Sequence, residues 1–168
     1  LVRHGTAPEG LSELLTGGHE AGARLADDAR VALVSATGST RMGRELGPRV
    51  AARFGRTLLE LGGNNAVIVA PSADPELAVR GIVFSAAGTA GQRCTTLRRL
   101  IVHSSVADAV VSRIAAAYQQ LPVGDPFVDG TLVGPLIHET SYRDMVGALQ
   151  QAEAEGGEVI GGERVDVG

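Results

Sequence analysis

The chain has 168 residues, a formal net charge of -4 at pH 7 and a single cysteine, and 44% of its residues are apolar. This length allows one good hydrophobic core, since domains usually contain about 100–200 residues. The slightly acidic charge and the 3% aromatic content argue against a nucleic-acid partner. One cysteine excludes an internal disulfide framework and a zinc site of paired cysteines, and the scattered histidines never fall in HExxH spacing.

Every basic residue of the chain is an arginine. Without lysine the chain can form no Schiff base, and it lacks the residue that a P-loop requires. No apolar run approaches the about 20 residues that a membrane span needs, and no signal peptide is recognisable. We therefore expect a cytoplasmic protein that binds no membrane and no metal.

Helical and strand-like patterns alternate along the chain. The expected elements are a helix over 18–27, a strand over 31–34, a helix over 41–54 that Gly55 closes, strands over 57–61 and 66–70, a helix over 74–87, a strand over 100–102, and helices from 105 and over 141–155. The helix at Asp74-Pro75 is well marked, because a capping carboxylate precedes proline at the first helical position. The short apolar strands are typical of strands buried on both faces. This alternation predicts an α/β fold with a largely parallel sheet.

Cys94 lies in the polar, glycine-rich segment from Gly88 to Thr96. Free cysteines are usually buried core residues, so an inert thiol is the simplest alternative. This segment has no apolar face, however, and its glycines would let the backbone approach a ligand closely. The neighbouring Arg93 would also favour the thiolate electrostatically. On chemistry alone, a nucleophile and an inert thiol are about equally well supported.

Glu60 interrupts an apolar run that extends from Leu58 to Leu61. A carboxylate buried there without a partner would be costly, so Glu60 either faces water from an alternating strand or serves as a base. Burial would raise its pKa and let it activate water near neutral pH. Because the following glycine pair permits a sharp exit from the strand, we favour the base.

The segment from Gly38 to Gly43 follows an expected strand and opens an expected helix. Backbone N–H groups and the helix dipole can hold a phosphate at such a position. Arg44 and Glu45 stand where a P-loop needs lysine and a hydroxyl residue, which excludes a nucleoside triphosphate site. Taken alone this motif is weak, because serine caps occur at many helices that bind nothing.

Together, three segments resemble the NAD(P)-dependent aldehyde dehydrogenase superfamily: Val34–Thr40, Leu59–Gly63 and Gly91–Cys94. The longer segments Leu61–Asn65 and Gly88–Thr96 are similar to the antiquitin-like branch, the 2-aminoadipate 6-semialdehyde (piperideine-6-carboxylate) dehydrogenases of lysine catabolism. Most other branches carry a lysine where this chain has Asn64. The resemblance covers nearly all of this chain but only a minority of a family subunit.

This resemblance implies that Cys94 attacks an aldehyde to give a thiohemiacetal, that hydride passes to NAD or NADP, and that Glu60 activates the water that hydrolyses the thioester. The backbone N–H of Cys94 would supply half of an oxyanion hole. Arg93 and Thr95 would touch the substrate, and the Arg93 guanidinium could hold the carboxylate of an amino-acid semialdehyde. The implied cofactor residues are Gly22, Ala23 and Met42 on the adenine side, Gly38 and Ser39 at the pyrophosphate, and Leu61 against the nicotinamide.

The resemblance also implies two incomplete α/β domains. Residues 1–60 would form the C-terminal part of a Rossmann-type NAD-binding domain, and residues 61–168 the N-terminal part of the catalytic domain. We expect the isolated chain to be inactive and the full-length enzyme to be a homo-oligomer, a tetramer in the usual family form. Ala36 stands where the family usually has phenylalanine, which should loosen the packing beneath the phosphate loop.

Several alternatives stay open. A broad-specificity aliphatic aldehyde dehydrogenase would share the same motifs, whereas a CoA-acylating relative generally lacks a base where Glu60 stands. A non-catalytic scaffold that keeps the fold would have no need to retain both Cys94 and Glu60. A cysteine hydrolase would need a histidine partner, for which His103 is the nearest candidate in sequence.

Overall fold

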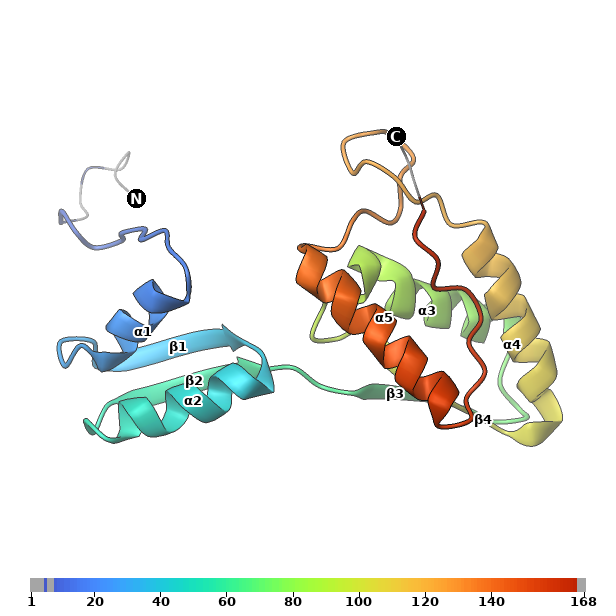
Figure 1. Ribbon diagram of the computed structural model, residues 1–168, viewed down its shortest axis with the longest axis horizontal. Coiled ribbons are helices and arrows are strands. Elements are labelled where there is room, and N and C mark those ends of the chain that lie inside the picture. Colours follow the sequence, from blue (N-terminus) through green and yellow to red (C-terminus); the bar gives the residue numbers. More distant parts are fainter. Residues whose placement is uncertain (1–4, 6–7, 166–168) are drawn as a thin grey trace. The chain divides into compact units, whose positions relative to one another are not determined.

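The computed structural model of the chain describes residue 5 and residues 8–165, so the outer ends of both predicted domains, 1–4, 6–7 and 166–168, lie outside it. The chain forms two compact units, residues Leu1–Gly62 (unit 1) and Gly63–Gly168 (unit 2) (Figure 1). Both units consist of helices and parallel strands, as the predicted α/β class requires.

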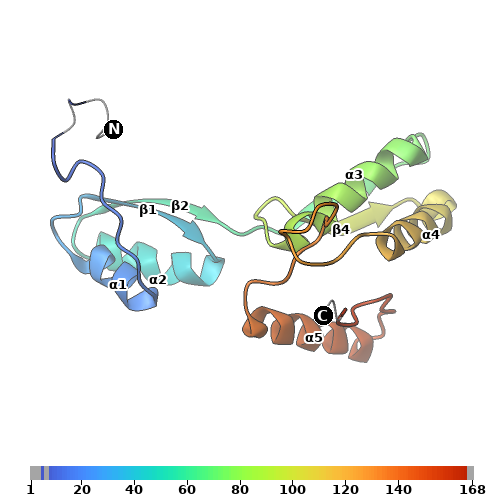
Figure 2. The ribbon, with the colours of Figure 1, turned by 90° about the horizontal axis from the view of Figure 1, so that it is seen from above.

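Unit 1 is a β-α-β arrangement preceded by a helix. Its elements are α1 (His19–Asp27), β1 (Leu33–Gly38), α2 (Thr40–Ala51) and β2 (Arg56–Leu61). The two strands are parallel, and their register runs from Leu33 opposite Arg56 to Gly38 opposite Leu61. Helix α2 makes the crossover that parallel neighbours need, and it lies with α1 on one face of the strand pair (Figure 2).

Helix α1 is fixed to α2 by one apolar contact layer and two polar links. Ala26 and Val50 are fully buried. The guanidinium of Arg49 grips both carboxylate oxygens of Asp27, with Nη2 2.6 Å from Oδ2, and the Arg53 Nε donates to the Ala26 carbonyl at 2.7 Å. The hydrogen bonds from Arg49 hold the pKa of Asp27 below its usual value. Both helices therefore stay in place around the carboxyl end of β1.

The ends of α2 are closed by local hydrogen bonds. Ser39 caps the first turn, because its Oγ accepts from the Met42 N–H at 3.1 Å. At the other end, Gly55 closes the helix as predicted, because its N–H donates to the Val50 carbonyl at 3.0 Å. Phe54, the residue before it, takes the left-handed conformation (φ 60°).

Unit 2 contains a second parallel pair and three α-helices. Its elements are β3 (Asn65–Val69), α3 (Pro75–Ala87), the 3-10 turn η2 (Gly88–Gly91), β4 (Leu97–Val102), α4 (Ser104–Gln119) and α5 (Glu139–Ala154). The predicted start of α3 is confirmed, since the Asp74 carboxylate accepts from the Leu77 N–H at 3.1 Å and Pro75 opens the helix.

The core of unit 2 lies between the β3–β4 pair and helices α3 and α4. Four residues are buried there, Val69, Ile82, Leu97 and Val110. They come from four different elements, so each element contributes one side chain to the centre of the unit. The strand pair that leads to Cys94 is held by this core.

The expectation that the strands are buried on both faces is wrong for the described residues. Leu33 in β1 is 48% exposed, Ile68 in β3 is 77% exposed and Ile101 in β4 is 53% exposed. Each described sheet has only two strands. Neighbouring residues of a strand point to opposite faces of the sheet. The helices cover only one of these faces, so the apolar residues on the opposite face are exposed to solvent.

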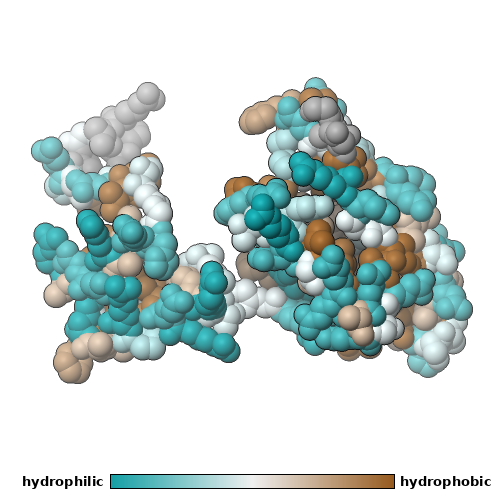
Figure 3. Space-filling model, in the orientation of Figure 1, coloured by the Kyte–Doolittle hydropathy of each residue, from teal (hydrophilic) through white to brown (hydrophobic). Residues whose placement is uncertain are grey.

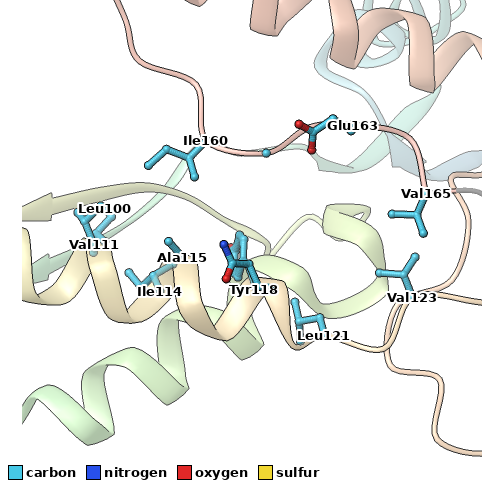
Figure 4. A pocket seen from close by; sticks show the side chains of 12 residues that line it. Leu100, Val111, Ile114, Ala115, Tyr118, Leu121, Val123, Ile160, Glu163 and Val165 are labelled. Carbon is cyan, nitrogen blue, oxygen red and sulfur yellow. The ribbon is translucent and has the colours of Figure 1, made fainter.

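Between α4 and α5 the chain forms a long connection, closed by a bridge between Val123 and Val133. This connection, α4 and residues 160–165 line an apolar groove of about 830 Å³. Figure 4 shows that Val111, Ile114 and Tyr118 of α4 line one side of it, and apolar atoms are visible on this face of the unit in Figure 3. Burial in the groove wall raises the pKa of Tyr118.

Within the described part of the chain, no helix is both long and apolar enough to cross a membrane. The same residues contain no group of three or more His, Cys, Asp or Glu side chains that could hold a metal ion.

A matched pair of valines on α4 tests the position of the core. Val110 is 1% exposed and Val111 is 43% exposed. Val110→Ala should lower the free energy of unfolding by about 1–3 kcal/mol, because it leaves a cavity among the core residues. Val111→Ala should change it by less than about 1 kcal/mol. Urea denaturation of the purified variants measures both values, and equal losses would contradict this core.

Candidate functional site

Cys94 stands in a turn between η2 and β4, and its side chain is exposed. The thiol therefore does not lie in the hydrophobic core of the described residues, and its reactivity stays a prediction. Thr96, two residues later, is only 4% exposed, and its hydrogen bonds stabilise the turn. Its Oγ1 accepts from the Arg93 N–H at 3.1 Å, and its own N–H donates to the Arg93 carbonyl at 3.1 Å. These reciprocal bonds present the Cys94 thiol to solvent on a closed loop of backbone.

The backbone N–H of Cys94 donates to no acceptor among the described residues. A free N–H beside an exposed thiol can bind a negatively charged oxygen that develops on a group attacked by that thiol. The half oxyanion hole that the resemblance implies therefore stays a prediction, for which this N–H is available.

A tight left-handed bend leads into the turn. Thr89 (φ 55°), Ala90 (φ 52°) and Gly91 (φ 72°) occupy this conformation in succession. For residues with a side chain it is unfavourable by about 1–2 kcal/mol each, and strained backbone of this kind occurs often at functional sites. The bend reverses the chain between the end of α3 and Cys94 over only a few residues.

Gln92 connects the bend to the connection between α4 and α5. Its Nε2 donates to the carbonyls of Thr89 (3.1 Å) and Pro135 (3.4 Å), and its Oε1 accepts from the Ile137 N–H at 2.9 Å. Sequence reasoning missed Gln92 and Thr96 as supports of the turn. The Thr96 bond to the Arg93 N–H is local but has no distinctive sequence pattern, and two partners of Gln92, Pro135 and Ile137, lie more than forty positions away.

Arg93 lies half-buried against the end of α3. Its guanidinium is stacked 5.6 Å from the centre of the Phe84 ring, and Nη2 donates to the Phe84 carbonyl at 3.5 Å. A side chain on Gly88 would collide with Nη2, so glycine at this position makes room for the arginine. The Nε atom of Arg93 is buried and has no hydrogen-bond partner among the described residues. Thr95, the other residue predicted to touch the substrate, is exposed.

Glu60 lies on β2, opposite Thr37 of β1, and its side chain is exposed. Within unit 1, therefore, Glu60 faces water, as in the alternative of an alternating strand. Glu60 belongs to unit 1 and Cys94 to unit 2, so the geometry of each is defined by its own unit.

Three of the residues assigned to the adenine side of the cofactor come together in unit 1. Gly22 and Ala23 of α1 and Met42 of α2 line a groove of about 340 Å³ beside β1. Ala36, the departure from the usual phenylalanine, lines the same groove. Glu45 and Arg49 line the groove as well, so it is only partly apolar.

The other predicted cofactor residues lie at the ends of the strands next to this groove. Ser39 uses its hydroxyl as the α2 cap, and a Cβ on Gly38 would come within 2.7 Å of the Met42 methyl. Leu61 packs on Gly43, where an added Cβ would lie 2.6 Å from Leu61 Cδ1. The N–H groups of Met42 and Gly43 already donate to Ser39, and phosphate binding at this helix start stays a prediction.

The sequence profile of the aldehyde dehydrogenase family matches residues 1–168. The chain belongs to the aldehyde dehydrogenase family. It spans about a third of the relatives it matches. It is 47% identical over 158 residues to an alpha-aminoadipic semialdehyde dehydrogenase from Bos taurus, which covers 94% of this chain and 29% of the relative. It is 45% identical over 160 residues to an aldehyde dehydrogenase family 7 member A1 from Brassica napus, covering 95% of this chain and 32% of the relative.

Solved structures of family members share the fold. A succinate-semialdehyde dehydrogenase from Burkholderia pseudomallei superimposes with a TM-score of 0.91 at 34% identity, over 99% of this chain and 35% of that one. An aldehyde dehydrogenase from Mycobacterium tuberculosis, solved in complex with NAD+, gives a TM-score of 0.86 at 34% identity over 89% and 31%. The chain is thus one part of the aldehyde dehydrogenase fold.

Two glycines of α2 test the packing beneath Leu61. Gly43→Ala should lower the free energy of unfolding by about 1–3 kcal/mol, because its methyl group displaces Leu61. At Gly47 an added Cβ meets only Leu59 Cδ1, at 3.8 Å. Gly47→Ala should therefore lower the free energy of unfolding less than Gly43→Ala does, because it displaces no packed side chain and its helix propensity offsets the contact of its Cβ with the Pro48 ring. Urea denaturation of both variants decides, and a stabilising Gly43→Ala would contradict the packing of Leu61.

Proposed function

We propose that the intact enzyme that contains this chain oxidises an aldehyde to the carboxylate with NAD(P). The observation that carries the proposal is an exposed Cys94 in a braced turn, with a free backbone N–H, in a member of the aldehyde dehydrogenase family. The same features argue against a non-catalytic scaffold, which would have no use for an exposed thiol held at one position.

Cys94 begins the reaction. Its thiolate forms a bond to the aldehyde carbon, the carbonyl π electrons move to oxygen, and the Cys94 N–H donates to that oxygen. NAD(P), when bound, accepts the hydride that leaves the same carbon, which leaves a thioester on Cys94. Glu60 takes a proton from water as the water attacks the thioester carbon, and cleavage of the C–S bond releases the acid and the thiolate.

Unit 1 contributes the residues that would hold the cofactor. Gly22, Ala23 and Met42 would lie against the adenine in their common groove. Gly38 and Ser39 would meet the pyrophosphate at the start of α2, and Leu61 would lie against the nicotinamide. Support comes from the groove itself and from NAD+ complexes of structurally similar family members. In this assignment residues 1–60 are part of the cofactor domain and residues 61–168 part of the catalytic domain.

We propose 2-aminoadipate 6-semialdehyde as the substrate, and hence a role in lysine degradation. Relatives at 46–47% identity are named alpha-aminoadipic semialdehyde dehydrogenases. Arg93 and Thr95 flank Cys94, and the guanidinium of Arg93 can donate paired hydrogen bonds to a carboxylate. We further propose a cytoplasmic homo-oligomer for the intact enzyme, with a tetramer as the form that the family resemblance implies.

The division of work between Cys94 and Glu60 can be tested by NADH formation in the intact enzyme. Cys94→Ser should abolish turnover. Glu60→Gln should still give a burst of about one NADH per site, because the thioester forms, followed by a steady state slowed about 10²- to 10⁴-fold. Rapid-mixing absorbance at the NADH band measures both phases. Glu153→Gln, an exposed carboxylate of α5, is the control and should behave like the wild type.

Two results would contradict these roles. A Glu60→Gln enzyme with unchanged steady-state turnover would remove Glu60 from thioester hydrolysis. Turnover that survives Cys94→Ser would remove the covalent step. A wild-type enzyme that oxidises no aldehyde with either NAD or NADP would instead favour the scaffold.

The substrate assignment can be tested by comparing two aldehydes. Arg93→Ala should lower kcat/KM about 10- to 100-fold for 2-aminoadipate semialdehyde, because charge-assisted hydrogen bonds to its carboxylate are lost. It should change kcat/KM for an uncharged aliphatic aldehyde much less. Arg98→Ala, at an exposed position nearby, serves as the control. Equal losses for both aldehydes would limit Arg93 to supporting the turn, and equal wild-type turnover of both would indicate a broad-specificity enzyme.

A further inference from the structure

A side chain of β3 reaches the backbone on both sides of Thr95. The carboxamide nitrogen of Asn65 donates to the Cys94 carbonyl at 2.7 Å and to the Thr96 carbonyl at 3.0 Å. Both partners are acceptors, so the nitrogen of the amide, and not its oxygen, must face the turn. Asn65 thus holds the backbone of the candidate nucleophile itself, from a neighbouring strand.

The strand register explains why a side chain is needed at this point. Asn65 lies opposite Leu97, but Ala66 lies opposite Arg99, so β4 carries an extra residue, Arg98, in a bulge. A bulge interrupts the regular backbone ladder and changes the direction of the strand. On the side of the bulge towards Cys94, the carboxamide N–H groups of Asn65 connect β3 to the turn by hydrogen bonds, in place of backbone hydrogen bonds.

Gly63 leaves room for this connection. A Cβ added at Gly63 would lie 3.3 Å from the Asn65 Oδ1 and 3.9 Å from the Cys94 carbonyl oxygen. The first distance is tighter than ordinary van der Waals contact, so any side chain would press on the carboxamide. Arg99 secures the same stretch of backbone, because its Nη2 donates to the Asn64 carbonyl at 2.7 Å.

We propose that Asn65 is a positioning residue for Cys94: its carboxamide fixes the Cys94 and Thr96 carbonyls and thereby the direction of the Cys94 thiol and N–H. This inference rests on the proposed aldehyde oxidation for its kinetic consequence, whereas its structural consequence can be measured without that reaction. Orientation matters for acyl chemistry, since a displacement of about 1 Å can lower a rate by about 10²-fold.

The experiment compares Asn65→Ala with Asn65→Asp in the intact enzyme. Asp has nearly the size of Asn but donates no hydrogen bond when ionised. Both variants should lower kcat per folded site about 10- to 100-fold, with the KM for NAD changed little, because the lost geometry affects the reacting carbon and not the cofactor. Alkylation of Cys94 by iodoacetamide should change less than about threefold, because an exposed thiol reacts with a small reagent from many directions. Peptide mapping identifies the Cys94 label.

Asn64 provides a matched control. It is adjacent and exposed, its side chain makes no hydrogen bond among the described residues, and its carbonyl survives substitution. Asn64→Ala should therefore retain wild-type kcat and wild-type hydrogen exchange in residues 93–97. Gly63→Ala should lower kcat less than Asn65→Ala does, because its methyl group shifts the carboxamide oxygen by only a few tenths of an ångström.

Several outcomes would overturn the proposal. A normal kcat in Asn65→Ala would do so, as would a large loss in Asn65→Ala with full activity in Asn65→Asp, since side-chain volume would then be what matters. A lowered melting temperature with normal kcat per folded site would indicate a structural role only. If the wild-type enzyme oxidises no aldehyde, the proposed function fails. The Asn65 inference is then decided by hydrogen exchange, which should rise at residues 93–97 in Asn65→Ala and stay unchanged in Asn64→Ala.

Discussion

The closed turn around Cys94 depends on the buried hydroxyl of Thr96, because one side chain there satisfies an N–H of the turn while its own backbone closes it. An exposed thiol would otherwise lie on mobile backbone, and chemistry at a single atom requires that atom to be held in place. Thr96 is buried directly before the core residue Leu97. Because Thr96 is bonded in sequence to this core residue, packing in the core of unit 2 also restrains the turn.

Other parts of unit 2 constrain the same few residues. The left-handed bend at Thr89 and Ala90 is unfavourable by itself, so it persists only because the surrounding contacts determine it. Gln92 supplies such contacts from the connection after α4, and Arg93 supplies them at the end of α3. The strain is therefore balanced by hydrogen bonds from elements distant in sequence, as is usual where backbone geometry serves a reaction.

Unit 1 applies a different constraint, the right-handed crossover of a parallel β-α-β arrangement. Because β1 and β2 run in the same direction, the start of α2 and the carboxyl ends of both strands lie at one edge. Ligands of open α/β sheets bind at this edge. The groove lined by α1, β1 and α2 and the exposed Glu60 at the end of β2 are two results of that topology.

Local sequence determined much of this protein. The cap at Asp74, the proline that follows it and the apolar spacing of the helices predict elements that the structure contains, because these signals act within one helical turn. Three motifs in one order indicate the aldehyde dehydrogenase family, and Cys94 is the chain's only thiol. Only the tertiary structure decided that this thiol is exposed and that Asn65 reaches the Cys94 carbonyl. The Asn65 contact depends on a strand bulge and on partners about thirty positions apart, which no local pattern specifies.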